Sequence, residues 1–145
     1  MSHVEGHIVS LQLCPGHRKA MHIVATARAV ENLGLEGDRH AIRDSSRQVL
    51  LIEEETLGAL ALRPGDVKEN ITTSGIALMS LQTGQRINVG SQVVLQITKP
   101  CSPCSRMDEI RPGLRSALAG RRGMLAAVVR GGPVAVGDSI TVTSK

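Results

Sequence analysis

Short runs of apolar residues, alternating or continuous and closed by Gly, Pro, Asp or Asn, recur along the whole chain. Because successive side chains of a strand point to opposite faces, such runs predict strands. Strands are expected over residues 8–13, 21–30, 48–52, 86–90, 92–98 and 124–130, with a closing pair over 134–142. A helix stays an alternative for 21–30, and Gly90-Ser91 predicts a hairpin turn.

Two segments have the features of short helices. Residues 53–62 open with three glutamates, which suits a helix N-terminus, and residues 112–118 open with a proline. Many short strands with few helices predict a mainly β fold, a barrel or a sandwich. At 145 residues, the chain is expected to form a single domain, 1–145.

The composition narrows the range of partners. The chain has no Phe, Tyr or Trp, so its core must be aliphatic and it has no aromatic platform for stacking nucleic-acid bases. The net charge is +4, but the basic residues are scattered rather than clustered as in a nucleic-acid-binding arm. We therefore expect a small anion such as a phosphate as partner, and no nucleic acid.

Hydropathy and cysteine usage indicate a cytoplasmic protein with no membrane partner. No run approaches the roughly 18 apolar residues that a membrane span needs, and no secretory signal pattern is visible. Three cysteines are too few for a disulfide scaffold and suit a reducing cytosol, where thiols act as ligands or nucleophiles.

The sequence KPCSPCSRMDE at residues 99–109 is the first candidate for chemistry. It follows an expected strand and precedes a helix-like run, so it predicts a rigid turn that carries Cys104. Lys99, Arg106 and Arg111 lie near in sequence, and positive charge stabilises the reactive thiolate. Such a cysteine can bind a soft metal, carry a persulfide or attack an electrophile; the alternative is a buried, inert thiol.

The Cys-x-x-Cys spacing of Cys101 and Cys104 has two further interpretations. Thioredoxin-like redox chemistry is disfavoured, because the chain has little βαβ pattern. A structural zinc site is an open alternative, since Cys14 and His17 have a second legitimate spacing. The four residues Cys14, His17, Cys101 and Cys104 would then stabilise an interaction module.

Two other segments suit an anionic ligand. In residues 34–40, two glycines allow close backbone approach and Arg39 offers a planar fork for phosphate oxygens, although an ordinary surface turn explains the segment equally well. Lys68 and Asn70 are two positions apart, so in a strand they would share one face. The alternative there is a solvated edge strand. Lys19 and Arg47 are weaker candidates.

Several of these segments, taken in order, resemble one known family. They are GLEGDRHA at residues 34–41, RQVLLI at 47–52, PGDVKENIT at 64–72, PCSRMD at 103–108 and VGDSI at 136–140. The chain resembles a stand-alone MOSC domain, named after the C-terminal domain of molybdenum cofactor sulfurase. The resemblance implies a MOSC-type β-barrel that binds molybdenum cofactor (molybdopterin) or transfers sulfur through one essential cysteine. Some relatives reduce N-hydroxylated compounds with the bound cofactor.

The resemblance also assigns roles to particular positions. Cys104 matches the cysteine that ligates molybdenum or bears the persulfide, and Ser102 matches a cofactor-holding position. Further matches to positions that grip the phosphate or the pterin are Arg39, Asn70, Lys68 and Lys19. The sequence contains neither the additional N-terminal barrel domain nor the desulfurase domain of larger relatives. Sulfur would therefore come from a separate persulfide donor such as a cysteine desulfurase, with Cys101 as a resolving thiol, and electrons from a redox partner.

Overall fold

The computed structural model describes residues 5–143, which form mostly strands with three short α-helices and one 3₁₀ turn. The strands are β1 (Glu5–Leu13), β2 (His22–Val24), β3 (Thr26–Val30), β4 (Gly34–Leu35), β5 (Val49–Glu53), β6 (Ile71–Ser74), β7 (Arg86–Val89), β8 (Val93–Pro100), β9 (Met124–Arg130), β10 (Gly132–Ala135) and β11 (Ser139–Val142). The helices are α1 (Glu54–Ala59), η1 (Leu78–Ser80), α2 (Ser105–Ile110) and α3 (Leu114–Ala117). None of the helices in the described part of the chain is long and apolar enough to cross a membrane.

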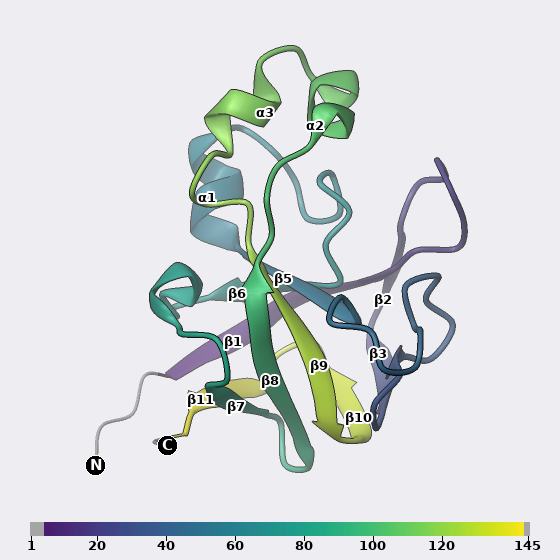
Figure 1. Cartoon of the computed structure of the whole chain (residues 1–145). Coiled ribbons are helices and arrows are strands. Elements are labelled where there is room, and N and C mark those ends of the chain that lie inside the picture. The colour runs from purple at the N-terminus through teal and green to yellow at the C-terminus, as the bar shows by residue number, and fades with distance from the viewer. Residues whose placement is uncertain (1–4, 144–145) are drawn as a thin grey trace.

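Seven strands close into a barrel in the order β11-β7-β8-β9-β5-β6-β1, because β1 pairs with β11 at its first residues (Figure 1). Neighbouring strands are antiparallel except β5 and β6, which are parallel and are connected through α1. Strand β2 extends the sheet from β1, and β10, β3 and β4 form a separate small sheet. Closure leaves the barrel strands no free edge. The expected mainly β barrel with short helices is confirmed.

The barrel interior is filled by aliphatic side chains, as a chain without aromatic residues requires. Along β8, Val93, Leu95 and Ile97 are buried in the main core cluster, whereas the residues between them are half-buried. This alternation is the period of two that the sequence of residues 92–98 predicted. Burying each such side chain contributes about 1.5–3 kcal/mol.

Strand β5 is buried on both faces, and so it separates the barrel interior from the functional end of the molecule. Val49 and Leu51 belong to the main core, Leu50 packs in a small cluster with Cys101 and Leu125, and Ile52 packs beneath the helices. The three α-helices gather at one end of the barrel, where Figure 1 shows them above β5 and β9. Their apolar sides form a second core around Leu57, Met107, Leu114 and Leu118.

Most expected elements are present, and two expectations were wrong in detail. Residues 67–70 are not a strand: Lys68 has a left-handed φ of 69°, and β6 begins only at Ile71. Residues 134–142 hold two strands that do not pair with each other, because β10 joins β3 while β11 closes the barrel. For residues 21–30 the expected strand is confirmed, divided into β2 and β3, and the helix alternative is excluded.

Candidate functional site

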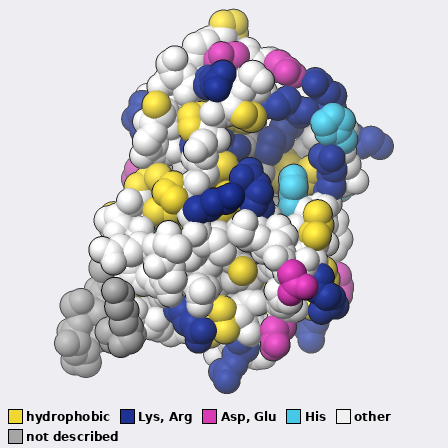
Figure 2. Space-filling model, in the orientation of Figure 1, with side chains coloured by type: hydrophobic (Ala, Val, Ile, Leu, Met, Phe, Trp, Pro, Cys, Tyr) yellow, Lys and Arg dark blue, Asp and Glu magenta, His cyan; other side chains and the backbone are white. Residues whose placement is uncertain are grey.

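A cleft of about 300 Å³ opens between the helical end and the loops that follow β1 and β4. We call it the Cys104 cleft. Figure 2 shows Lys and Arg side chains, with His among them, gathered on the helical side of the molecule. The lining residues are Cys14, Gly16, His17, Arg18, Lys19, Arg39, His40, Lys68, Cys104, Arg106, Met107 and Arg122. No carboxylate is among them, so the cleft suits an anionic ligand.

Cys104 lies at the junction between β8 and α2, where the strand has ended and the helix begins. Its backbone is extended, with φ −117° and ψ 176°, and its carbonyl accepts the first helical hydrogen bond from Met107 N–H at 2.9 Å. The thiol makes no capping hydrogen bond and the residue is exposed. The thiol is therefore free to meet a ligand, a metal or another protein. The alternative of a buried Cys104 is wrong.

A tether joins the cysteine-bearing helix to the loop after β1. The guanidinium of Arg18 contacts Glu109 of α2 at 2.8 Å, and both side chains are largely exposed. Exposed ion pairs contribute about 0–1 kcal/mol, so this one orients the loop more than it stabilises the fold. Glu109 also lies 3.9 Å from the guanidinium of Arg106, a second cation of the cleft.

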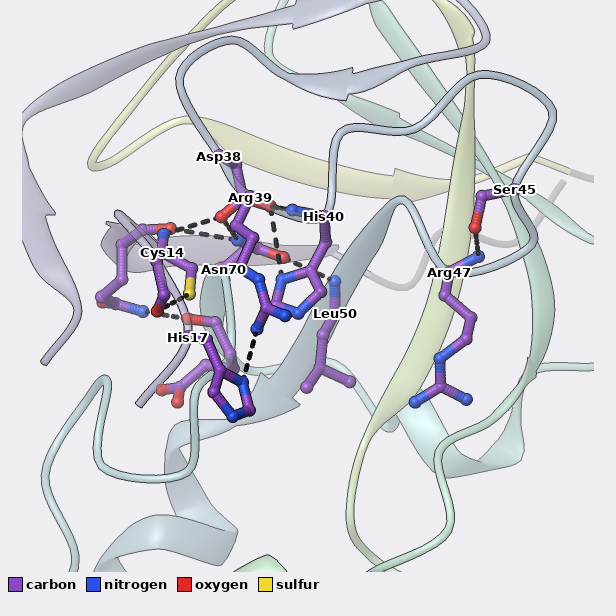
Figure 3. A network of polar contacts seen from close by, with 12 residues as sticks. Cys14, His17, Asp38, Arg39, His40, Ser45, Arg47, Leu50 and Asn70 are labelled. Carbon is purple, nitrogen blue, oxygen red and sulfur yellow. Dashed lines mark hydrogen bonds and ion pairs between the residues drawn. The ribbon is translucent and has the colours of Figure 1, made fainter. Parts of the chain in front are cut away.

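His17 and Arg39 form a contact across the Cys104 cleft. Arg39 donates from Nη1 to His17 Nδ1 at 3.2 Å (Figure 3). Since a guanidinium cannot accept a hydrogen bond, we infer that His17 carries its proton on Nε2. Desolvation, followed by the charges of Arg39, Arg106 and Arg18, lowers the pKa of His17, with Glu109 opposing. His17 is therefore a neutral Nε2–H donor at pH 7.

A buried polar network holds the loop that carries Arg39 (Figure 3). Asp38 Oδ1 accepts from Cys14 N–H at 2.7 Å and from Asn70 Nδ2 at 3.0 Å, while its Oδ2 accepts from His40 N–H at 3.1 Å. Asn70 also donates to Gln12 O and accepts from Leu50 N–H. Asn70 therefore joins the end of β1, the start of β5 and the Arg39 loop.

The structure places the other predicted residues as follows. Arg39, Lys68, Lys19 and Cys104 all line the Cys104 cleft. Lys68 Nζ lies 3.5 Å from Lys19 O, which is a long contact. Asn70 is buried, both of its amide hydrogens are used within the protein, and it lines a smaller neighbouring cavity. Ser102 is exposed, and it lines neither cavity.

The neighbouring cavity has a volume of about 110 Å³, and we call it the Cys101 cavity. Its lining residues are His40, Arg47, Leu50, Lys68, Asn70, Cys101, Arg122 and Leu125. His40, Lys68 and Arg122 also line the Cys104 cleft, so the two spaces adjoin. The two cysteines of one turn thus face different surroundings: Cys104 is exposed, whereas Cys101 is 7% exposed.

Sequence reasoning missed Arg122, which is 5% exposed and lies two residues before the start of β9. Its Nη2 donates to Val67 O at 2.6 Å, but its Nη1 has no hydrogen-bond partner among the described residues. Leaving a buried donor unpaired costs about 1–3 kcal/mol, and more for a charged group. Burial lowers the pKa of Arg122, opposed by Cys101, Glu69 and Cys104. Nothing in the sequence distinguishes Arg122 from its neighbour Arg121.

Sequence reasoning also missed Glu69, because an acidic residue next to a lysine is usually expected to be exposed. Its side chain is buried, and burial raises the pKa of its carboxyl group. One oxygen accepts from Gly65 N–H at 2.9 Å and from Thr72 Oγ1 at 2.6 Å, and the other has no partner among the described residues. Glu69 thus holds the segment that carries Lys68.

The zinc alternative is not supported by the positions of its four ligands. Across residues 5–143, no group of three or more His, Cys, Asp or Glu side chains is arranged to hold a metal ion. Cys14 is buried, and its thiol donates to Gly16 O at 3.4 Å. Cys101 lies in the Cys101 cavity, apart from the Cys104 cleft that the other three residues line.

Comparisons with known proteins agree with this architecture. A family model described as "MOSC domain" matches residues 37–141. None of the curated proteins matches the chain. Among solved structures, the YUAD protein from Bacillus subtilis has a TM-score of 0.84 at 22% identity, covering 99% of this chain and 98% of its own. YiiM from Geobacillus stearothermophilus has a TM-score of 0.78 at 18% identity, with coverage of 96% and 75%. YiiM from Escherichia coli has a TM-score of 0.73 at 18% identity, with coverage of 96% and 70%. At these identities the structural likeness shows the fold.

Proposed function

Because the chain belongs to the MOSC domain family, which is associated with molybdenum-cofactor-related binding, we propose that it binds molybdenum cofactor in the Cys104 cleft. Cys104 would be the protein ligand of the metal. The observation that carries the proposal is the exposed thiol in a cleft lined by cations without a carboxylate.

The residues present fit such a group. The cleft, at about 300 Å³, lies at the lower end of the range for small-molecule sites. Its lining combines a thiol, which is a soft ligand, with cations that match a phosphate monoester. When bound, the cofactor would supply redox chemistry at molybdenum, such as the reduction of N-hydroxylated compounds by some relatives, with electrons from a redox partner.

The side chains of the cleft have distinct tasks in this proposal. Arg39 offers a planar fork to phosphate oxygens, and Lys19 and Lys68 supply further positive charge. His17 offers its Nε2–H to a polar atom of the ligand without adding charge. Direct contacts from Ser102 and Asn70 stay predictions, and the bonds of Asn70 support a positioning role for it.

The test measures molybdenum and pterin in full-length protein purified anaerobically from cells that make the cofactor. We expect both in the wild-type protein, with molybdenum lost in Cys104→Ser and pterin reduced in Arg39→Gln. Arg43→Gln is the matched control, because it removes one exposed loop charge outside both cavities. The absence of molybdenum and pterin from the wild-type protein, or equal losses in Arg43→Gln, would overturn the proposal.

Sulfur transfer is a second candidate, favoured by the exposure of Cys104 beside α2. In this step the Cys104 thiolate attacks the outer sulfur of a donor persulfide, such as that of a cysteine desulfurase. The donor S–S bond breaks, the donor leaves as a thiolate, and Cys104 becomes the persulfide. Intact-mass measurement after incubation with the loaded donor should show one added sulfur that is absent from Cys104→Ser. An unchanged mass would exclude this role.

A further inference from the structure

The guanidinium of Arg122, which lines the Cys101 cavity, is only partly paired within the protein: Nη2 donates to Val67 O, whereas Nη1 has no partner among the described residues. Arg122 is 5% exposed. No ion pair of the described residues includes it, although Glu69 lies near enough to affect its charge. A guanidinium is always protonated under physiological conditions, and no partner within the described residues accepts from Nη1, so an anion that enters the cavity can pair with it.

The other residues that line the Cys101 cavity indicate which kind of ligand could pair with Arg122. Arg47, Lys68 and His40 add nitrogen donors, and no carboxylate lines the space. Leu50 and Leu125 form an apolar side that keeps out bulk water. A cavity surrounded by donors of one charge sign, one of them buried and unpaired, has the composition of an anion site.

The size of the cavity limits the anion. Its volume of about 110 Å³ is well below the range of roughly 300–1,000 Å³ that larger organic ligands need. A pterin or a nucleotide is therefore too large for this space. A compact anion with several oxygens can accept hydrogen bonds from Arg122 and from Arg47 at the same time.

We propose that the Cys101 cavity is a separate binding site for a small tetrahedral dianion, the class of sulfate, phosphate and molybdate. The unpaired Nη1 of Arg122 is the central donor, and Arg47 closes the outer side. The site stands on these residues and does not depend on cofactor binding in the Cys104 cleft. Because the two spaces share Lys68 and Arg122, the anion would enter from the cleft.

The experiment is a calorimetric titration of sodium sulfate, phosphate or molybdate into the full chain at constant ionic strength. It uses the Cys104→Ser background, so that the result is independent of the thiol on which the proposed function depends. We expect saturable binding of at least one of these anions at one site per chain. Binding should weaken about tenfold or more in Arg122→Gln, which removes a charge-assisted hydrogen bond.

Because Arg122 is buried and its substitution can disturb folding, the exposed Arg47→Gln provides a second variant with the same expected direction. Arg43→Gln, on the same loop but outside the lining, should bind as the parent does. A saturating anion should also slow alkylation of Cys101 by iodoacetamide, measured by peptide mass spectrometry. The absence of saturable binding, or an equal loss in Arg43→Gln, would overturn the proposal.

A further titration separates a free anion from the phosphate end of a larger ligand. Glycerol phosphate should bind more weakly than inorganic phosphate, because its ester group has no room in the small cavity. Equal binding of the ester that is weakened by Arg39→Gln would place the anion in the Cys104 cleft and overturn a separate site. Molybdenum content of the wild-type protein is measured independently, so failure here and failure of the proposed function are distinguishable.

Discussion

The barrel interior and the cleft end of this protein are stabilised in different ways, although strand β5 belongs to both. On the interior side, Leu51 packs among aliphatic side chains without any polar requirement. On the cleft side, the buried residues include Asp38, Glu69, Asn70 and Arg122, each with particular hydrogen-bond partners. Apolar burial is non-directional, whereas burying a polar group costs free energy that only correctly placed partners offset. The interior should therefore accept substitutions that keep volume, and the cleft end should reject substitutions that keep volume but change hydrogen bonding.

The largest effect is expected inside the barrel, for Leu51→Ala. Leu51 is fully buried, so its truncation leaves a cavity and should lower the free energy of unfolding by about 2–5 kcal/mol. Leu51→Met keeps the volume and should cost less than about 1.5 kcal/mol. Urea unfolding followed by far-ultraviolet circular dichroism measures both, since the chain has no Tyr or Trp for fluorescence. If both variants lost the same free energy of unfolding, the interior would not tolerate substitutions that keep the side-chain volume, contrary to our expectation.

The next effect is expected in the polar network, for Asn70→Ala. It removes the partner of Leu50 N–H and one donor to Asp38, so we expect a loss of about 2–3 kcal/mol in the free energy of unfolding. Asn70→Asp nearly keeps the volume but places a second carboxylate against Asp38. It should be at least as destabilising in the same urea experiment at neutral pH. If Asn70→Asp lost as little free energy of unfolding as Leu51→Met, the cleft end and the barrel interior would not differ in their tolerance of volume-conserving substitutions.

A pH-dependent effect is expected for Glu69. Burial raises the pKa of its carboxyl group in the folded state above the ordinary value of 4.5, so the folded chain binds this proton more tightly than the unfolded chain does. The stabilisation is complete below the ordinary value and is lost as pH rises through the raised value. The urea midpoint of Glu69→Gln should therefore fall less than that of the wild-type protein between about pH 4 and pH 8. Glu54→Gln, at an exposed position in α1, is the control that should keep the wild-type slope.

The smallest effect on stability is expected for His17→Gln. His17 is exposed and contacts only the flexible end of Arg39, so the free energy of unfolding should change by no more than about 0.5 kcal/mol. The same variant replaces the rigid imidazole donor of the Cys104 cleft with a flexible amide and should lower pterin retention in the purified protein. A loss of stability comparable to that of Asn70→Ala would show that the contact across the cleft is structural.

The sequence by itself determined the strands, most of the turns and the exposed chemistry of the protein. The alternation along β8 and the continuous apolar run of β5 are local patterns that need no knowledge of the rest of the chain. The same holds for the turn that presents Cys104 between a strand and a helix. The loop of Arg39 was found from its glycines and its charge, because a binding loop shows its residue types directly in the sequence.

Only the tertiary structure decided which side chains meet behind these loops. The amide of Asn70 bonds to Gln12 across 58 positions of the chain, and that meeting depends on how the barrel closes. Cys101 and Cys104 are three residues apart, yet Leu50 and Leu125 of neighbouring strands cover only the first. Arg122 is an unremarkable arginine in sequence and becomes a buried, half-paired charge only because other strands and loops surround it. Local periodicity reports the face on which a residue lies, but burial and partners come from distant segments, and these set the charge and bonding of the site.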